Sequence, residues 1–298
     1  MRKIIYILLL SGLIEVSVFS QGAVLNYPIQ FSQLDFFKSS INPALICLHS
    51  PLELIIGTQQ YTGYFKDIST QYANLGVQIP FRQPGEVSRN ILSIRVSNDQ
   101  EGVYISRNRA YLGYGFHTRI FNNFFLGGAL DFGFMGYVVE GTPSTGNASE
   151  YVMDGSAGIS LYNEVLTTGF SINQAFNNNV QPLDEVTRLY RHINAFASYN
   201  FVISKNAWVC PKILFRYPYK TGYNYNLDVG VETVLVKKLL LGSSYRYKNG
   251  LSFSSGITNL EVFKGFLTFC LAYNSPVSGS LINVNVFEFH LDYKHGVR

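Results

Sequence analysis

The sequence predicts an all-β protein, a transmembrane antiparallel β-barrel of about fourteen strands with an irregular periplasmic N-terminal lead-in. Charged residues make up only 14% of the 298 residues and aromatic residues 15%, a composition that suits a surface divided between lipid and water. Strict alternation of apolar and polar residues recurs after residue 50, as expected for strands with one face in each environment. The alternating segments also approach the length at which a tilted strand crosses a bilayer.

The alternation is clearest between residues 223 and 234. Val229 and Val231 share one face of this segment, whereas Asp228 and Glu232 share the other. Because a strand has a period of two residues, a membrane barrel would turn the apolar face to lipid and the polar face to the lumen. We therefore expect an arginine to be costly in place of Val229 and far cheaper in place of Asp228. A soluble β-sandwich would show the same alternation.

The number and spacing of the segments favour a barrel. We expect strands at residues 52–61, 70–80, 90–98, 107–118, 123–138, 153–161, 164–174, 190–202, 207–216, 223–234, 238–248, 250–258, 263–273 and 281–293. An even number places both ends of the barrel sequence in the periplasm. The connections at 142–149 and 177–181 should then face outside, and those at 162–163 and 205–206 should face the periplasm. One slip in the alternation predicts a β-bulge near Val286–Phe287.

Three parts follow one another along the chain. Residues 1–20 predict a cleavable signal peptide, because the basic pair Arg2-Lys3 precedes an apolar run too short to anchor as a membrane helix. Residues 21–51 form a lead-in without strand periodicity, interrupted by prolines. We expect an ordered periplasmic segment that could fold into the barrel mouth. Residues 52–298 form the barrel, so the exported chain is expected in the cell outer membrane.

The sequence indicates no catalytic residue, no cofactor and no metal site. Cys47, Cys210 and Cys270 lack the close spacing of metal ligands, and neither a nucleophile elbow nor a phosphate-binding loop occurs. A net charge of +4 without a basic stripe indicates no nucleic-acid partner. The charges with lumenal parity, which we expect to form solvated ion pairs, are Asp131, Asp154, Asp228, Glu232, Glu288, Arg95, Arg109, Lys212, Arg216 and Arg246.

Two short motifs in the lead-in resemble the opening of the PorP/SprF family of outer-membrane proteins. They are Gln30-Phe31-Ser32-Gln33 and, some eight residues further on, Asn42-Pro43-Ala44. The stretches 60–64 and 169–172 are similar to further motifs of that family. The chain departs from the family where Leu45-Ile46-Cys47 replaces the usual Tyr-Ala-Gly, so the subfamily stays open.

The resemblance implies a non-enzymatic barrel of the type IX secretion and gliding machinery of Bacteroidetes. Such a barrel would support export or surface attachment of adhesins, or would anchor the complex through periplasmic partners. The implied partners are the lipid bilayer, periplasmic lipoproteins, other secretion-system subunits and a large secreted adhesin. The candidate family-motif and partner-contact residues are Gln30, Phe31, Ser32, Gln33, Asn42, Pro43 and Ala44.

Two other classes of function remain open from the residues themselves. The first is an outer-membrane channel or transporter for small solutes, since a fourteen-stranded barrel can enclose a lumen. The second is a surface hydrolase, which would need an acid, a base and a nucleophile that converge in the folded chain.

Overall fold

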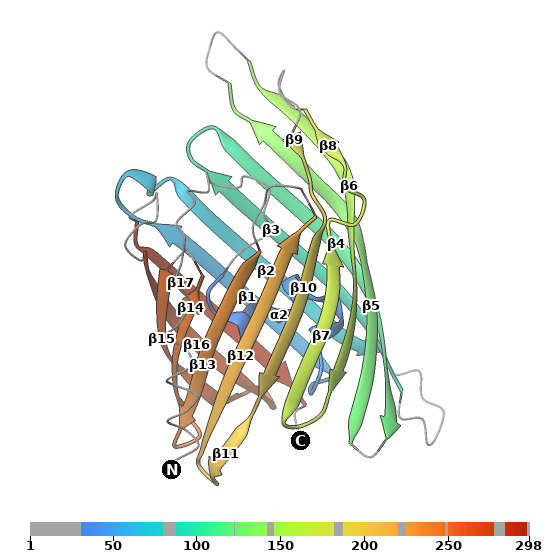
Figure 1. Cartoon of the computed structure of the whole chain (residues 1–298), viewed down its shortest axis with the longest axis vertical. Helices are drawn as coiled ribbons and strands as arrows, with labels where there is room; N and C mark the ends of the chain where they lie inside the picture. The colour runs from blue at the N-terminus through green and yellow to red at the C-terminus, as the bar shows by residue number, and fades with distance from the viewer. Residues whose placement is uncertain are drawn as a thin grey trace.

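The wall of the molecule is a closed β-barrel (Figure 1). The computed structural model describes residues 31–79, 88–121, 123–141, 146–181, 187–219, 225–247, 250–276 and 284–296. Within them, fourteen antiparallel strands follow one another around the wall, and the first pairs with the last, so that the sheet has no free edge. The prediction of a barrel of about fourteen strands is confirmed.

Each predicted strand corresponds to one wall strand, within five residues at either end. The wall consists of β1 (Leu52–Tyr61), β2 (Ile68–Ile79), β3 (Arg89–Glu101), β4 (Ile105–Phe121), β5 (Phe124–Val139), β6 (Ala148–Tyr162), β7 (Leu166–Asn173), β10 (His192–Tyr199) with β11 (Phe201–Ser204), β12 (Ala207–Pro218), β13 (Asn226–Leu235), β14 (Leu239–Arg246), β15 (Gly250–Val262), β16 (Gly265–Pro276) and β17 (Val286–His295). β10 and β11 count as one strand because both pair with β12.

A few shorter elements complete the described chain. β8 (Asn179–Val180) and β9 (Thr187–Arg188) form a small ribbon in the long connection between β7 and β10, which the sequence did not predict. The helices are α2 (Leu34–Ile41), η2 (Pro43–Leu45) and η3 (Gly63–Phe65). Among the described residues, no helix has both the length and the apolar character needed to cross a membrane.

The last wall strand corrects one expectation. β17 pairs with β16 in unbroken register, from Val286 opposite Asn274 to His295 opposite Gly265. The predicted bulge at Val286–Phe287 is therefore absent from the described part of this strand. The alternation slips there because the strand begins at Val286, so the residues before it belong to the preceding connection.

The two faces of β13 are assigned as predicted. The side chains of Val229 and Val231 are 44% and 39% exposed on the outer face, whereas Asp228 is 3% exposed inside. Asp228 does not face an aqueous lumen, however, because Arg216 and Arg246 bind its carboxylate at 2.7 and 3.0 Å. The expectation of a cheap arginine at position 228 is therefore wrong, since it would bury a third cation beside two others.

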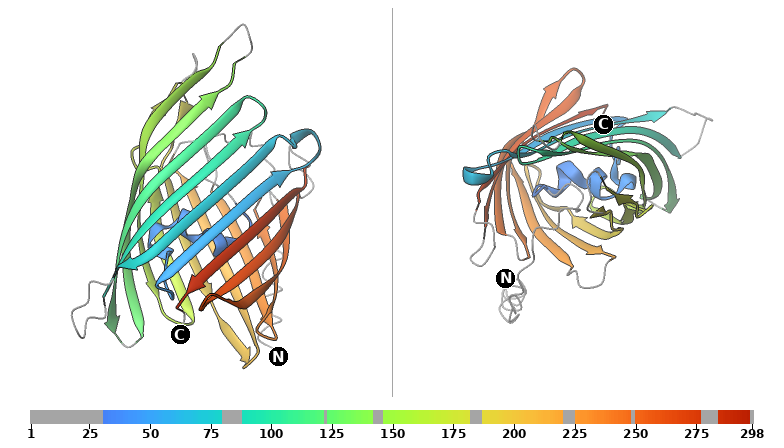
Figure 2. Two further views of the ribbon diagram at one scale, coloured as in Figure 1. Left: turned by 180° about the vertical axis from the view of Figure 1, so that it is seen from behind. Right: turned by 90° about the horizontal axis from the view of Figure 1, so that it is seen from above.

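The interior of the barrel contains part of its own chain. α2 and η2 lie inside the ring of strands when the barrel is seen from above (Figure 2). The lead-in was expected at the periplasmic mouth, and the structure places its residues 31–50 deeper, within the lumen. The predicted signal peptide and the first part of the lead-in, including Gln30, lie outside the described residues.

The connections fall into two sets at opposite ends of the barrel, because successive strands are antiparallel. The strand ends that flank the connections after β5 and after β7 share one end of the barrel, and the connections at 163–165 and 205–206 share the other. This agrees with the predicted grouping, and we continue to assign the second end to the periplasm as a prediction.

Two hairpins at the predicted periplasmic end have an unusual backbone. Val236 and Lys237 have φ angles of 51° and 60°, and Phe263 and Lys264 have φ angles of 46° and 63°. A hairpin turn with two successive left-handed residues favours Asn-Gly, because left-handed backbone is disfavoured for residues with a larger side chain. Each such residue costs about 1–2 kcal/mol. The chain therefore keeps a valine, a phenylalanine and two lysines at strained positions.

The outward orientation of Val229 can be tested by its response to charge. We expect Val229→Arg to reduce the free energy of unfolding by about 2–4 kcal/mol, because the side chain would enter the middle of the apolar band. Gln100→Arg is the matched control, since Gln100 is also exposed on its wall strand but lies at the end of β3. That variant should cost about 0–1 kcal/mol. Urea unfolding in lipid vesicles measures both, and equal costs would contradict the assignment.

Candidate functional site

Residues 31–50, called the plug from here on, occupy the lumen. The eight-residue helix α2 within the plug is too short to be stable alone. Its apolar side chains Leu34, Phe36, Phe37 and Ile41 are buried, in two clusters that include wall residues such as Leu214. Burial of a side chain of this size contributes about 1.5–3 kcal/mol. Packing against the wall therefore holds α2 in place.

One buried carboxylate binds the first motif of the plug. Glu288 on β17 is 2% exposed. It accepts hydrogen bonds from the backbone nitrogen of Ser32 at 3.0 Å and from Ser32 Oγ at 2.8 Å. Gln59 and Asn274 donate to the same carboxylate at 2.9 and 2.6 Å, and His290 Nε2 lies 3.1 Å from it. A carboxylate this deeply buried is stable only with several such donors.

Aromatic rings pack beside this carboxylate. Phe31 and Phe37 stack with their ring centroids 3.6 Å apart, and Phe36 stacks on His290 at 5.2 Å. Tyr72 on β2 meets the ring of Phe37 edge-on at 5.0 Å. The Ser32–Glu288 contact is thus shielded from water by rings from both plug and wall, which strengthens its hydrogen bonds.

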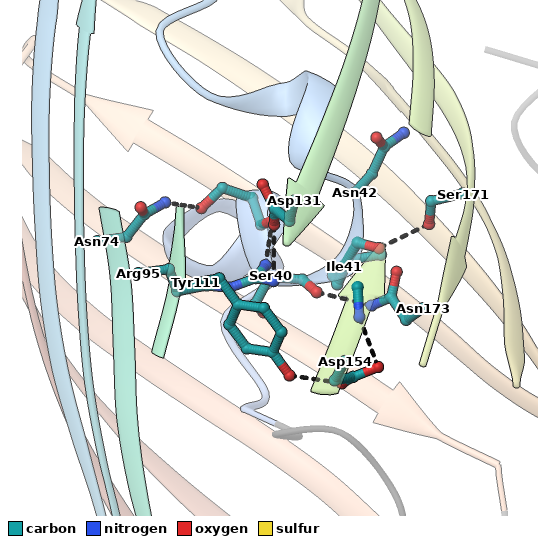
Figure 3. A network of polar contacts seen from close by, with 12 residues as sticks. Ser40, Ile41, Asn42, Asn74, Arg95, Tyr111, Asp131, Asp154, Ser171 and Asn173 are labelled. Atoms are coloured by element: carbon teal, nitrogen blue, oxygen red, sulfur yellow. Dashed lines mark hydrogen bonds and ion pairs between the residues drawn. The ribbon is translucent and has the colours of Figure 1, made fainter. Parts of the chain in front are cut away.

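The wall also satisfies the C-terminal end of α2 (Figure 3). The last carbonyls of a helix have no partner within the helix. For the carbonyls of residues 39–41 the donors come from the wall: Arg95 at 2.9 Å, Asn173 at 2.9 Å and Ser171 at 2.6 Å, in that order. The helix therefore ends where β3 and β7 offer side-chain donors.

The asparagine of the second motif binds the plug to the same side of the wall. Asn42 is 1% exposed. Its Nδ2 donates to the backbone carbonyls of Ile159 at 2.9 Å and Phe170 at 3.2 Å. Its Oδ1 accepts a hydrogen bond from Ala44 N at 2.9 Å and so starts the helical turn η2. One side chain thus joins the plug to both β6 and β7.

Glycines in the wall make room for these contacts. A Cβ atom at Gly158 would lie 1.9 Å from Asn42 Oδ1, and one at Gly169 would lie 2.5 Å from Asn42 Nδ2. On the other side of the lumen, a Cβ at Gly57 or Gly76 would come within 2.6 Å of plug side chains. The wall is therefore shaped to the plug at specific positions.

Charges also cross between plug and wall. Lys212 on β12 binds Asp35 of α2 and, at 2.9 Å, Glu232 of β13. On the other side, Lys38 lies 3.5 Å from Glu53 of β1. Burial alone would raise the pKa of Asp35, but Lys212 and Lys38 outweigh burial and hold that pKa below its ordinary value. Asp35 is therefore ionised at neutral pH and paired with the wall.

The lumenal charges predicted from parity do pair, but away from water. Each is buried or half-buried, so the expectation of solvated pairs is wrong for these residues. The pairs are Arg95 with Asp131 at 2.7 Å, Arg109 with Asp99, Lys212 with Glu232, and Asp228 with both Arg216 and Arg246. Asp154 instead accepts a hydrogen bond from Tyr111 Oη at 2.6 Å.

A small cavity lies beside the plug. The cavity beside Arg95, Arg109 and Asp154 measures about 30 Å³, which is room for a few water molecules at most. Towards the predicted outer end, Val180 and Leu189, in and beside the β8–β9 ribbon, are buried in a further apolar cluster with Met135 of β5. The lumen is thus narrowed twice, by the plug and by the ribbon.

The predicted contact residues are brought together, and they contact the barrel itself. Phe31, Ser32, Gln33, Asn42, Pro43 and Ala44 are all buried within the lumen. Contact of these residues with another protein stays a prediction. Sequence reasoning gave Glu288 only lumenal parity and missed Gly158 altogether, because neither residue signals its partner in the plug.

One residue that departs from the family pattern has a left-handed backbone. Cys47, which stands where the resemblance would place glycine, has a φ of 52°. Glycine adopts this left-handed backbone without strain, so the glycine of the family pattern at this position indicates a left-handed conformation. Cys47 is buried beside Gly76, and its thiol packs against the wall.

Barrels of known structure share this fold. A Pseudomonas aeruginosa FadL homologue is 10% identical, with a TM-score of 0.53 over 86% of this chain and 93% of its own. The monoaromatic hydrocarbon channel CymD is 12% identical, with a TM-score of 0.54 over 93% and 95% of the two chains. The Ralstonia pickettii toluene transporter TbuX is 8% identical, with a TM-score of 0.53 over 86% and 92%. At these identities the likeness establishes the fold alone.

The closed wall, the apolar outer face and the filled lumen define an outer-membrane β-barrel with an internal plug. The family model described as type IX secretion system membrane protein PorP/SprF matches residues 24–293. The chain therefore belongs to the PorP/SprF family, as its motifs indicated. No curated protein matches the chain in sequence.

The fit between Asn42 and Gly158 predicts coupled stabilities. We expect Gly158→Ala to reduce the free energy of unfolding by about 1–3 kcal/mol, because its Cβ would collide with Asn42. Asn42→Ala should cost about 1–3 kcal/mol through lost buried hydrogen bonds. The double variant should cost less than the sum, since the collision disappears.

Urea unfolding followed by the fluorescence of Trp208, which packs against a plug cluster, measures these costs. Gly128→Ala is the control, because a Cβ there would meet nothing within 4 Å. Additive costs in the double variant would show that Asn42 and Gly158 do not act on each other.

The low pKa of Asp35 predicts that acid loosens the plug. A carboxyl whose pKa is lower in the folded state stabilises that state above its unfolded pKa of about 3.9. This stabilisation is lost as the pH falls through the lower, folded pKa. We expect Trp208 fluorescence to change in that range in the wild-type protein, and Asp35→Asn to lack this transition. An identical acid transition in both proteins would exclude Asp35 as its source.

Proposed function

We propose that the chain is a non-enzymatic component of the type IX secretion and gliding machinery in the outer membrane. It supports export or surface attachment of adhesins, or anchors the complex through periplasmic partners. The observation that carries the proposal is a lumen filled by the motifs that mark the family: Ser32 binds Glu288, and Asn42 binds the backbones of β6 and β7.

A filled lumen supports a structural role over a transport role. A solute passing through the barrel would have to displace Asn42, the rings around Phe37 and the Lys212–Asp35 pair. Opening such a path would leave buried charges without partners, which is strongly unfavourable. The partners of the barrel would then bind at its ends or on its outer wall.

A channel or transporter for small solutes is the second candidate. The observation that favours it is the fold shared with a monoaromatic hydrocarbon channel and a toluene transporter. In this chain such a route would need a path around the plug or a movement of residues 31–50.

Two measurements on one set of variants separate these functions. In planar bilayers we expect no steady large conductance from the wild-type protein, and a clear rise when residues 31–50 are deleted. Photo-crosslinkers at Lys205 and Asn163 in intact envelopes should capture secretion-system subunits or periplasmic lipoproteins, identified by mass spectrometry. A crosslinker at the lipid-facing Val229 is the matched control for chance encounters.

The outcomes of these measurements distinguish the secretion role from the channel role. Capture of secretion-system subunits at Lys205 but not at Val229 supports the proposed role. A large steady conductance of the wild-type protein, together with no specific capture, would overturn it in favour of the channel. The signal peptide at residues 1–20 belongs to the same proposal and is tested by the N-terminal residue of the envelope protein.

A further inference from the structure

Three neighbouring hairpins end side by side at the predicted periplasmic end of the barrel. They join β11 to β12, β13 to β14 and β15 to β16. Lys237 N donates to Asn206 O at 2.9 Å, and Asn259 Nδ2 donates to Lys237 O at 2.8 Å. These hydrogen bonds tie the three hairpins into one surface, called the hairpin surface below.

The hairpin surface is basic. Lys205, Lys237, Lys238 and Lys264 are all exposed on it, and none of the four takes part in an ion pair within the described chain. Glu261 is the exposed acidic residue close to them in the sequence, so the lysines outweigh the acid. Elsewhere at this end, the β6–β7 turn carries Glu164. The β4–β5 hairpin at this end carries the exposed Arg119, so the hairpin surface holds most, not all, of the exposed positive charge among the described residues of this rim.

The same surface also displays apolar side chains at its tips. Phe263 is 88% exposed and Val236 is 76% exposed. Both lie at the strained left-handed positions of their turns, each followed directly by a lysine. Backbone strain that persists at an exposed position points to a functional constraint. Here the constraint is to present a large apolar group beside a cation.

The tips continue the apolar band of the barrel. From Tyr225, directly before β13, to Leu235 at its end, the outward residues are mostly apolar. Ten residues of tilted strand correspond to roughly 25 Å of height, which is the thickness of the lipid-facing band. Val236 and Lys237 follow Leu235 directly, so they lie where the band ends and the phospholipid headgroups begin.

We infer that the hairpin surface is a binding site for anionic phospholipids of the periplasmic leaflet. The four lysines bind the phosphate groups, and Phe263 and Val236 insert among the parts of the acyl chains that lie nearest the headgroups. Charge complementarity and continuity with the apolar band favour a lipid over an acidic protein. The inference does not depend on the proposed role in secretion.

Native mass spectrometry of the detergent-purified protein tests the contribution of the lysine charges to lipid binding. The probes are phosphatidylglycerol, phosphatidylcholine and inorganic phosphate at equal concentrations. We expect retention of phosphatidylglycerol over phosphatidylcholine and little displacement by inorganic phosphate. Each change of lysine to glutamine on the hairpin surface should weaken phosphatidylglycerol binding about fivefold. Lys66→Gln, at an exposed position at the other end of the barrel, is the matched control and should not weaken it.

Phe263→Asn and Val236→Asn test the apolar half of the site. Asparagine tolerates left-handed backbone, so both variants should unfold at an equal or higher urea concentration than the wild-type protein. They should nevertheless retain less phosphatidylglycerol. A purely structural turn would gain stability with no change in lipid retention, and that result would overturn the role of these side chains.

Other results would overturn the site as a whole. These are equal retention of the two lipids by the wild-type protein, an equal loss with Lys66→Gln, or full displacement by inorganic phosphate. Each of them would show that the hairpin surface does not select an anionic phospholipid.

Discussion

The interior of this protein depends on one constraint, which is that charged groups turned away from lipid need partners inside the barrel. About eight strands enclose a space that side chains alone can fill, and fourteen enclose more. Here the extra space is filled by the chain's own residues 31–50. Glu288 is stable in the wall because Ser32 supplies two of its hydrogen bonds, and α2 is stable because Arg95 and Asn173 satisfy its end. Wall and plug are therefore parts of one polar network.

The wall could be predicted closely and the contents of the lumen could not, for a physical reason. The alternation that places Val229 outside and Asp228 inside is a local property of a strand, readable from neighbouring residues. The Ser32–Glu288 contact joins residues 256 positions apart, and no local pattern encodes such a pairing. Parity gave the inward direction of Lys212 but not its partner Asp35, because the lead-in has no period from which an orientation could be read.

The family motifs, which sequence reasoning offered as contacts with other proteins, have an explanation within the barrel. Asn42 binds two wall carbonyls, and it fits there only because Gly158 and Gly169 lack side chains. Gly169 begins one of the strand stretches that carried the resemblance, so two motifs far apart in sequence form one contact. Cys47 is a second case in which a motif position has an explanation within the barrel. Its backbone is left-handed although it stands where the family pattern has glycine, the residue that suits this conformation.

A plug held in this way limits where function can lie. Withdrawing it would expose Glu288, Lys212 and the carbonyls at the end of α2 to solvent, or would leave them without their partners from the other side of the contact. Breaking one buried ion pair alone typically costs about 3–5 kcal/mol. A plug that opened readily would need fewer of these contacts or a partner able to replace them. The residues free to meet other molecules are consequently those on the outer wall and at the rims, and at one rim Val236 and Phe263 retain strained backbone and exposed side chains. In this barrel the packing of the interior and the recognition of other molecules fall to different parts of the chain.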